Sequence, residues 1–179
     1  MLIAMAGLPG TGKTTVANAL AAHLGAVVLS KDATRAALFP PETIVYSAQQ
    51  DDLCFSVMLQ AAAFLLSRSP DRPVILDGRT FSGRGQVVGV VQAALKMDVP
   101  LVLIECTCSE ATALQRLALD QALQNHIAGN RDADLYRKLK TSADPLDLPH
   151  LVVDTDTPLA CTIKQCLAYL ASHRPSCGS

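Results

Sequence analysis

One short stretch near the beginning of the chain restricts the possible folds more than any other feature. Residues 7–14 read Gly-Leu-Pro-Gly-Thr-Gly-Lys-Thr, in which four residues separate a glycine from a Gly-Lys-Thr triplet. This spacing is typical of loops that wrap around the phosphates of a nucleotide. Glycines allow the backbone to curve closely around phosphate oxygens, so that several N–H groups point inward at the anion. The apolar run 2–6 and the alanine-rich helical pattern that starts at Lys13 supply the strand and the helix that such a loop requires.

The residues of this loop have distinct expected roles. A helix that begins at Lys13 directs its positive end at the phosphates. We expect the Lys13 ammonium to reach the β- and γ-phosphates and the Thr14 hydroxyl to bind Mg²⁺. No Asn-Lys-x-Asp sequence, which is typical of guanine recognition, occurs in the chain, and this argues against a GTPase. The nucleotide-binding residues predicted from the loop are Gly7, Gly10, Thr11, Gly12, Lys13, Thr14 and Thr15.

Short apolar runs alternate with longer helical patterns along the chain. The runs contain almost no polar residues, which is typical of strands buried on both faces of a parallel sheet. The alternation therefore predicts an α/β fold. The predicted strands are 2–6, 26–29, 73–76, 101–105 and 151–153, and the predicted helices are 13–24, 47–67, 83–97, 109–125 and 158–172. The length of 179 residues fits one domain that comprises residues 1–179.

The composition narrows the class of substrate and the compartment. The chain has 15 Lys and Arg against 16 Asp and Glu, whereas a protein that holds a long polyanion usually carries a basic excess. This balance favours a small substrate over nucleic acid. No apolar run approaches the ~20 residues that span a bilayer, and no basic signal segment precedes the first strand, so we expect a cytoplasmic protein without a membrane segment. The six cysteines lack the spacing of a zinc site, and several of them lie inside apolar runs, where we expect small, reduced core residues.

Charged residues follow several of the predicted strands, where ligands of open α/β sheets bind. Asp32 and Arg35 are three residues apart and share one face of a helical turn. We expect Asp32 to accept the proton of an attacking hydroxyl, and Arg35 to hold an anionic substrate group or to orient Asp32. Asp77 ends an apolar run and is expected to bind Mg²⁺, directly or through water, or to support the metal ligands. Arg79 and Arg84 lie just beyond it and are candidates for substrate binding.

Four segments together resemble a known family, the P-loop kinases of the zeta-toxin and AAA_33 type. These segments are Gly-Leu-Pro-Gly-Thr-Gly-Lys-Thr at 7–14, Ser-Lys-Asp-x-x-Arg at 30–35, Val-Ile-Leu-Asp-Gly-Arg-Thr-Phe-Ser-x-Arg at 74–84 and Val-Asp-Thr-Asp-x-Pro at 153–158. The family is related to polynucleotide 5′-kinase, chloramphenicol phosphotransferase and adenylylsulfate kinase. The resemblance implies a P-loop NTPase three-layer α/β/α sandwich with a five-stranded parallel sheet in the order 2-3-1-4-5. It also implies a small lid over approximately residues 120–142.

The resemblance implies roles for single residues as well. Asp32 resembles the general base of the family, and Arg35 and Arg84 resemble arginines that bind the substrate. Arg116 resembles the arginine that packs on adenine at the base of the lid. The loop from Thr155 to Pro158 matches a position at the edge of the adenine, so that both residues are expected to bind the nucleotide.

One position departs from the pattern of this family. Many nucleotide-kinase-like enzymes carry a further arginine four residues after the adenine arginine, and here that position is Asp120. Another cation must then meet the charge of the transition state. We expect Arg131 to do so, with Arg137 as the second candidate, since both lie near the polar segment 124–142.

The combined prediction is an ATP-dependent phosphotransferase that moves the γ-phosphoryl group of ATP to a hydroxyl of a small-molecule acceptor, with Mg²⁺ as cofactor. The expected catalytic residues are Asp32, Lys13 and Arg131, and the expected metal ligands are Thr14 and Asp77. Two alternatives stay open. One is a polynucleotide or nucleoside 5′-kinase, which the charge balance does not favour, and the other is a regulatory ATP-binding NTPase that is not a kinase.

Overall fold

A computed structural model of the protein describes residues 1–122 and 132–173. Five parallel strands form one sheet in the order β2-β3-β1-β4-β5, which confirms the expected topology. Each predicted strand is present, with ends that differ from the prediction by at most two residues. The strands are β1 (Leu2–Ala6), β2 (Val27–Ser30), β3 (Val74–Asp77), β4 (Leu101–Thr107) and β5 (Leu151–Asp154).

All five predicted helices are also present in the described ranges, where they end within a few residues of the expected bounds. They are α1 (Lys13–Leu24), α3 (Ala48–Arg68), α4 (Arg84–Met97), α5 (Glu110–Ala122) and α7 (Leu159–Ser172). Two further helices are α2 (Lys31–Leu38), which extends the expected helical turn at Asp32, and α6 (Ala133–Ser142), which lies in the polar segment expected to form a lid. No helix of the described ranges is both long and apolar enough to cross a membrane.

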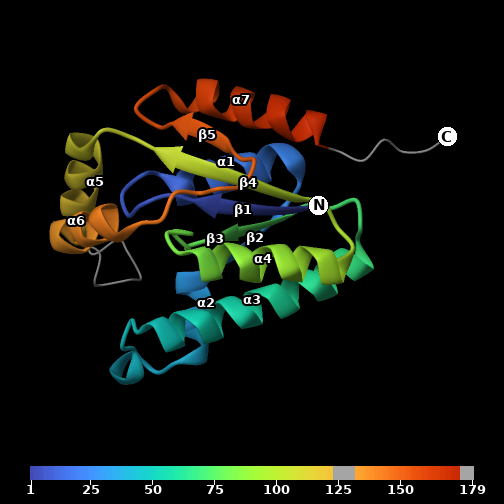
Figure 1. Ribbon diagram of the computed structural model, residues 1–179, viewed down its shortest axis with the longest axis horizontal. Coiled ribbons are helices and arrows are strands. Elements are labelled where there is room, and N and C mark those ends of the chain that lie inside the picture. Colours follow the sequence, from blue (N-terminus) through green and yellow to red (C-terminus); the bar gives the residue numbers. More distant parts are fainter. Residues whose placement is uncertain (123–131, 174–179) are drawn as a thin grey trace.

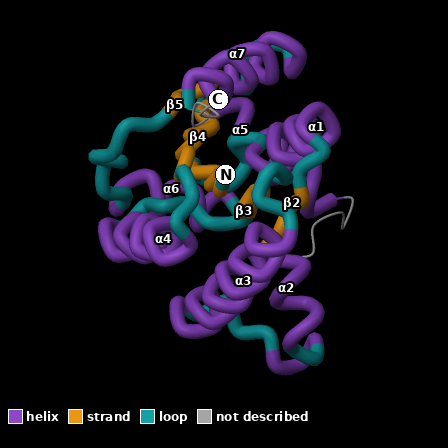
Figure 2. Tube along the Cα trace, turned by 90° about the vertical axis from the view of Figure 1, so that its right-hand side faces the viewer, coloured by secondary structure: helices purple, strands orange, loops and turns teal. Residues whose placement is uncertain are grey.

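Two layers of helices cover the sheet. Successive residues of a strand point to opposite faces, and in β1 both sets are apolar and fully buried. Leu2 and Ala4 pack with residues of α3 and α4, such as Met58, on one face. Ile3 and Met5 pack with residues of α1 and α7 on the other. Figures 1 and 2 show the resulting sandwich, in which β1 and its neighbours run between the two layers.

The carboxyl ends of the strands face a third group of helices. In Figure 1 the strand arrows point toward α5 and α6, which lie side by side beyond the end of the sheet. Ala113 and Leu117 of α5 and Tyr136 of α6 form a small buried cluster against which Leu8 packs. Leu8 belongs to the glycine-rich loop, so this cluster holds α6 close to that loop.

Side-chain caps determine where α2, α3 and α6 begin. The Ser47 hydroxyl accepts a hydrogen bond from the backbone N–H of Gln50 at 3.2 Å, which satisfies a free donor of the first turn of α3. The hydroxyl of Ser30 caps α2 in the same way. These two caps place Asp32 and Asp51 in the first turns of neighbouring helices, at the carboxyl edge of the sheet.

Three of the six cysteines occupy the core, as the sequence predicted. Cys54, Cys106 and Cys166 are buried, while Cys108 is half-buried and Cys161 is exposed. Burial raises the pKa of Cys106 to about 12 and that of Cys166 to about 11. Both thiols therefore stay protonated at neutral pH and behave as small apolar side chains. Cys177 lies outside the described residues.

The packing of α1 on the sheet makes a stability prediction. Leu20 is 0% exposed in the core beneath α1, whereas Leu95 on α4 is 68% exposed. Replacing Leu20 with alanine leaves a cavity, so the free energy of unfolding should fall by about 3 kcal/mol. Leu95→Ala is the matched control and should change it by less than about 0.5 kcal/mol. Urea titrations followed by circular dichroism measure both, and equal losses would contradict the observed packing.

Candidate active site

The glycine-rich loop has a backbone that only glycine adopts easily. Gly7, Gly10 and Gly12 all have positive φ angles, of 126°, 78° and 79°. A side chain at Gly10 would also lie 2.6 Å from the carbonyl oxygen of Ala113, and one at Gly7 would collide with the carbonyl oxygen of Cys106. The loop therefore approaches the neighbouring backbone too closely for any other residue. This is the geometry that the spacing of glycines in the sequence predicted.

Lys13 lies over this loop. Its ammonium donates to the carbonyl oxygens of Gly7 at 2.8 Å and Leu8 at 2.7 Å. The side chain is buried, since Lys13 is only 6% exposed. A buried ammonium held against a glycine-rich loop at the start of a helix is suited to bind the terminal phosphates of a nucleotide.

Thr14 and Asp77 form the part of the site that suits a metal ion. The Thr14 hydroxyl donates to Oδ2 of Asp77 at 2.8 Å, which connects the first turn of α1 to the end of β3. Asp77 is buried, and its Oδ1 has no hydrogen-bond partner among the described residues. A buried carboxylate oxygen without a partner is costly unless a ligand compensates it. Oxygen donors of this kind are those that Mg²⁺ prefers, so the residues present fit a magnesium ion next to the loop.

A pocket lies between α5 and α7, next to Gly12 of the glycine-rich loop. Arg116 donates to the hydroxyl of Thr155 at 2.9 Å, to its carbonyl oxygen at 2.8 Å and to the carbonyl oxygen of Gly10 at 3.3 Å. The pocket has a volume of about 330 Å³. Its lining comprises Gly12, Thr15, Val16, Arg116, Thr155, Thr157, Leu159 and Thr162. Pro158 directly precedes the first residue of α7 beside this pocket. The structure thus brings together Arg116, Thr155 and Thr15, three of the residues predicted to bind the nucleotide.

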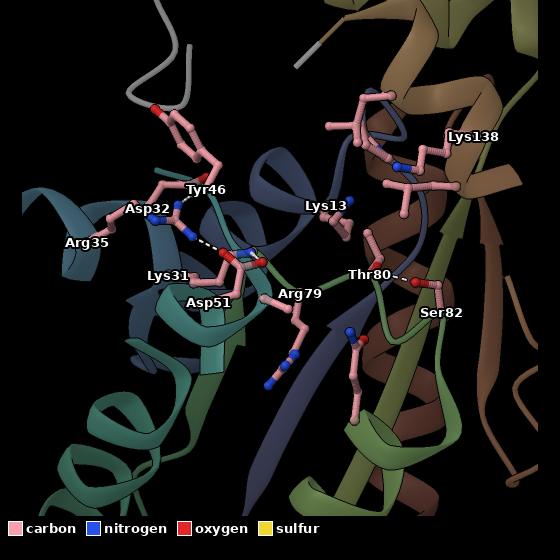
Figure 3. Close-up of a pocket in the computed structure, with 16 residues that line it drawn as sticks. Lys13, Lys31, Asp32, Arg35, Tyr46, Asp51, Arg79, Thr80, Ser82 and Lys138 are labelled. Carbon is pink, nitrogen blue, oxygen red and sulfur yellow. Dashed lines mark hydrogen bonds and ion pairs between the residues drawn. The ribbon is translucent and has the colours of Figure 1, made fainter. Parts of the chain in front are cut away.

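A group of charged residues lines a cavity of about 390 Å³ next to Lys13. The elements that contribute are the loop, α2, α3, the segment after β3, and α6. The lining comprises Pro9, Lys13, Lys31, Asp32, Arg35, Tyr46, Ala48, Asp51, Gly78, Arg79, Thr80, Ser82, Gln86, Leu135, Lys138 and Leu139. In Figure 3, the residues of α2 and α3 form one wall and Thr80, Ser82 and Lys138 the other, with Lys13 between them.

Ion pairs connect α2 to α3 along the first wall. Arg35 donates to Oδ1 of Asp32 at 2.8 Å and also forms an ion pair with Asp51. Lys31 forms an ion pair with the other oxygen of Asp51 at 2.7 Å, and the ring of Tyr46 lies 4.9 Å from the Arg35 guanidinium. Two carboxylates and one ring thus hold Arg35 beside Asp32. In this arrangement Arg35 is placed to orient Asp32, one of the two roles that its spacing suggested.

The two arginines that follow β3 occupy different environments. Arg79 is buried, pairs with Asp52 and lies 4.6 Å above the ring of Phe55, and it lines the cavity. The Arg84 side chain is 78% exposed at the start of α4 and lies 3.8 Å from Asp147. It lines a separate pocket between α4 and the segment before β5. The structure therefore brings Arg79 to the cavity and does not bring Arg84 there.

The cations expected in the lid are placed as follows. Arg131 lies outside the described residues. Arg137 is exposed and donates to Asp134 at 3.2 Å, one turn back on α6. The residue of α6 that carries a positive charge into the cavity is Lys138.

Sequence reasoning missed Lys31, Asp51, Tyr46 and Lys138. Asp51 was visible only as an acidic residue near the start of a helix, where it complements the helix dipole. Its contact with Arg35 depends on how α2 packs against α3, for which the sequence has no local signal. In the part of the chain that the structure describes, no cluster of three or more His, Cys, Asp or Glu residues is arranged to hold a metal ion.

Several solved structures share this fold. A gluconokinase from Sinorhizobium meliloti 1021 is 21% identical, with a TM-score of 0.69 over 95% of this chain and 91% of that chain. The APS kinase CysC of Mycobacterium tuberculosis, solved with AMPPNP and APS, is 15% identical, with a TM-score of 0.73 over 95% and 96%. A sugar kinase from Janibacter sp. HTCC2649 is 16% identical, with a TM-score of 0.65 over 99% and 98%. These similarities show a kinase-like P-loop NTPase fold.

Two sequence comparisons were informative in different ways. No curated protein matches the chain. The sequence model of the AAA_33 family, described as an AAA domain, matches residues 2–126. This match covers more than half of the chain and includes the glycine-rich loop, Asp32, Asp77 and Arg116, so the protein belongs to the AAA_33 family.

Proposed function

We propose that the protein is an ATP-dependent phosphotransferase that moves the γ-phosphoryl group of ATP to a hydroxyl of a small-molecule acceptor. The observation that carries this proposal is that Asp32 and Lys13 line one cavity. A carboxylate that only accepts hydrogen bonds lies across from the lysine of a phosphate loop, with room for a small molecule between them. Kinases that act on small molecules need this pairing of a base with a phosphate site. A regulator that only binds ATP needs no such second cavity.

The two pockets divide the substrates between them. The pocket beside Arg116 and Thr155 is suited to the adenine, because it lies on the far side of the loop from the charged cavity and contains mostly hydroxyl and aliphatic groups. The triphosphate then extends along the loop to Lys13. The cavity between α2 and α6 receives the acceptor, and solved proteins of this fold include a gluconokinase, a sugar kinase and an APS kinase.

The roles of the side chains follow from this placement. Arg35 holds Asp32, whose side chain is only 8% exposed, in a fixed orientation. Asp32 accepts the proton of the acceptor hydroxyl as its oxygen attacks the γ-phosphorus. The Lys13 ammonium and the loop N–H groups donate to the phosphate oxygens and stabilise the negative charge there. Thr14 and Asp77 are the residues that would hold Mg²⁺, which supplies neutralisation of phosphate charge when bound.

Asp32 provides the first test of the proposal. Asp32→Asn keeps the shape of the side chain but removes the base, so kcat should fall by about 10²- to 10⁴-fold. The affinity for ATP–Mg should stay within about twofold, because Asp32 lies on the acceptor side of the loop. A coupled assay of ADP release measures kcat in the presence of panels of sugars, sugar acids, nucleosides and amino alcohols. Isothermal titration calorimetry measures the binding of ATP–Mg.

The exposed residue Asp71 offers the control Asp71→Asn, which should leave both quantities unchanged. Undiminished acceptor-dependent turnover of Asp32→Asn would rule out the assigned role of Asp32. ATP hydrolysis that no acceptor in the panels stimulates would instead favour a regulatory NTPase.

Arg116 provides a test of the nucleotide side. Arg116→Ala removes two hydrogen bonds that connect α5 to Thr155 after β5, and a third that connects α5 to Gly10 of the glycine-rich loop. We expect the Kd for ATP–Mg to rise by about tenfold or more, since charged hydrogen bonds contribute about 1.5–3 kcal/mol each. Arg68→Ala, on an exposed part of α3, is the control. The Kd values are measured by calorimetry, and equal values for Arg116→Ala and the wild type would place the adenine elsewhere.

A further inference from the structure

Helix α6 carries four charged side chains, and one of them differs from the rest. Arg137 pairs with Asp134 at 3.2 Å, and Lys140 pairs with Glu110 of α5 at 2.7 Å. Lys138 instead lines the acceptor cavity. Within the described ranges its ammonium has no hydrogen-bond or ion-pair partner.

The direction of Lys138 follows from the periodicity of α6. Residues three and four positions apart share one face of a helix, and the three residues of α6 that line the cavity are Leu135, Lys138 and Leu139. Arg137 is only one position before Lys138, which turns its side chain by about 100° around the helix axis. The helix therefore presents one cation to the cavity and the other to the outside.

Helix α6 packs against α5 on both sides of Lys138 in the sequence. Tyr136 is buried between Ala113 and Leu117 of α5, and Leu8 of the phosphate loop packs on the same cluster. The ion pair between Lys140 and Glu110 fixes the next turn. Because Tyr136 touches the same cluster as the loop, the distance between Lys138 and the loop is determined by packing and not by a long linker.

Three other cations of the cavity pair with carboxylates. Arg35 lies between Asp32 and Asp51, Lys31 pairs with Asp51, and Arg79 pairs with Asp52. Lys13 donates to two carbonyl oxygens of the glycine-rich loop. Lys138 is thus the lining cation whose ammonium pairs with no other residue of the described ranges. Figure 3 shows its ammonium directed toward Lys13. Two ammonium groups directed into the same space repel each other unless an anion lies between them.

We propose that the Lys138 ammonium contacts the γ-phosphoryl group while it is transferred. This proposal rests on the proposed function. In the step, the bond between the γ-phosphorus and the oxygen bridging to the β-phosphate breaks, and a bond from the acceptor oxygen to the same phosphorus forms. The acceptor proton moves to Asp32, and ADP leaves with the electrons of the broken bond. Lys138 stays protonated and donates hydrogen bonds to the non-bridging oxygens, where it stabilises the charge of the transition state.

The test compares the binding of ADP–Mg alone with its binding in the presence of aluminium fluoride. Aluminium fluoride takes the place of the phosphoryl group in the transition state of its transfer. For Lys138→Met we expect unchanged ADP–Mg affinity, but a loss of about 10²-fold in the additional affinity that fluoride provides. Lys138→Arg keeps the charge and should recover most of that loss. Calorimetry provides both constants, and circular dichroism melting confirms that each variant folds.

Two further variants sharpen the comparison. Lys96→Met removes an exposed lysine of α4 and should leave both affinities unchanged. Arg137→Met examines the rival assignment that the sequence suggested. A loss of the fluoride increment in Arg137→Met, but not in Lys138→Met, would overturn our assignment in favour of Arg137.

The remaining outcomes separate this inference from the proposed function. If Lys138→Met keeps the full fluoride increment and instead raises only the KM of the acceptor, Lys138 binds an anionic group of the acceptor. The inference is then wrong, while the phosphotransferase assignment stands. If the wild type gains no affinity from fluoride and transfers phosphate to no acceptor, the proposed function fails, and the role of Lys138 fails with it.

Discussion

The structure depends on one constraint, which is that β1 is buried on both faces and ends in a loop that only glycines can form. The side chains of β1 are apolar on both sides, so the strand has no position in the fold except the centre of the sheet. Its carboxyl end must then emerge between β3 and β4. The backbone turns there within van der Waals reach of its neighbours, and the glycines at 7 and 10 are required because any side chain would collide with adjacent carbonyl oxygens. The position of Lys13, Thr14 and the start of α1 follows from this turn.

The hydrogen bond from Thr14 to Asp77 connects this loop and helix to a second strand of the sheet. It joins the helix after β1 to the end of β3, which is the neighbouring strand. The second oxygen of Asp77 is buried without a partner in the described residues. A buried carboxylate oxygen without a partner destabilises the fold. A metal ion bound with a nucleotide at this position would compensate for that loss of stability.

Charge pairing shapes the acceptor side of the loop. Carboxylates at the starts of α2 and α3 neutralise the cations of α2 and of the segment after β3. Pairing with these carboxylates offsets the desolvation penalty of burying arginine and lysine side chains in a small cavity. On the wall opposite Asp32, Lys138 of α6 pairs with no other described residue, so an incoming anion can be bound there as well as at Lys13.

Much of the fold was determined by the sequence alone. The apolar runs predicted five strands, and the glycine spacing predicted the loop with Lys13 and Thr14, because both signals are local and depend on a few adjacent residues. The order of the strands, which the resemblance to P-loop kinases implied, was confirmed. Asp32, Asp77 and Arg116 could be named in advance because each lies at a short distance from a strand end or matches a family motif.

The tertiary structure alone decided which charged side chains meet. The network of Asp51 and Arg35 joins residues 16 positions apart through the packing of α2 on α3. The sequence also could not distinguish Arg137 from Lys138, since the two are adjacent and similarly charged. Which of them faces the cavity depends on the rotation of α6 about its own axis, and the burial of Tyr136 against α5 sets that rotation. Local patterns determine helices and strands, whereas the facing of a polar helix is determined only by the surface on which it packs.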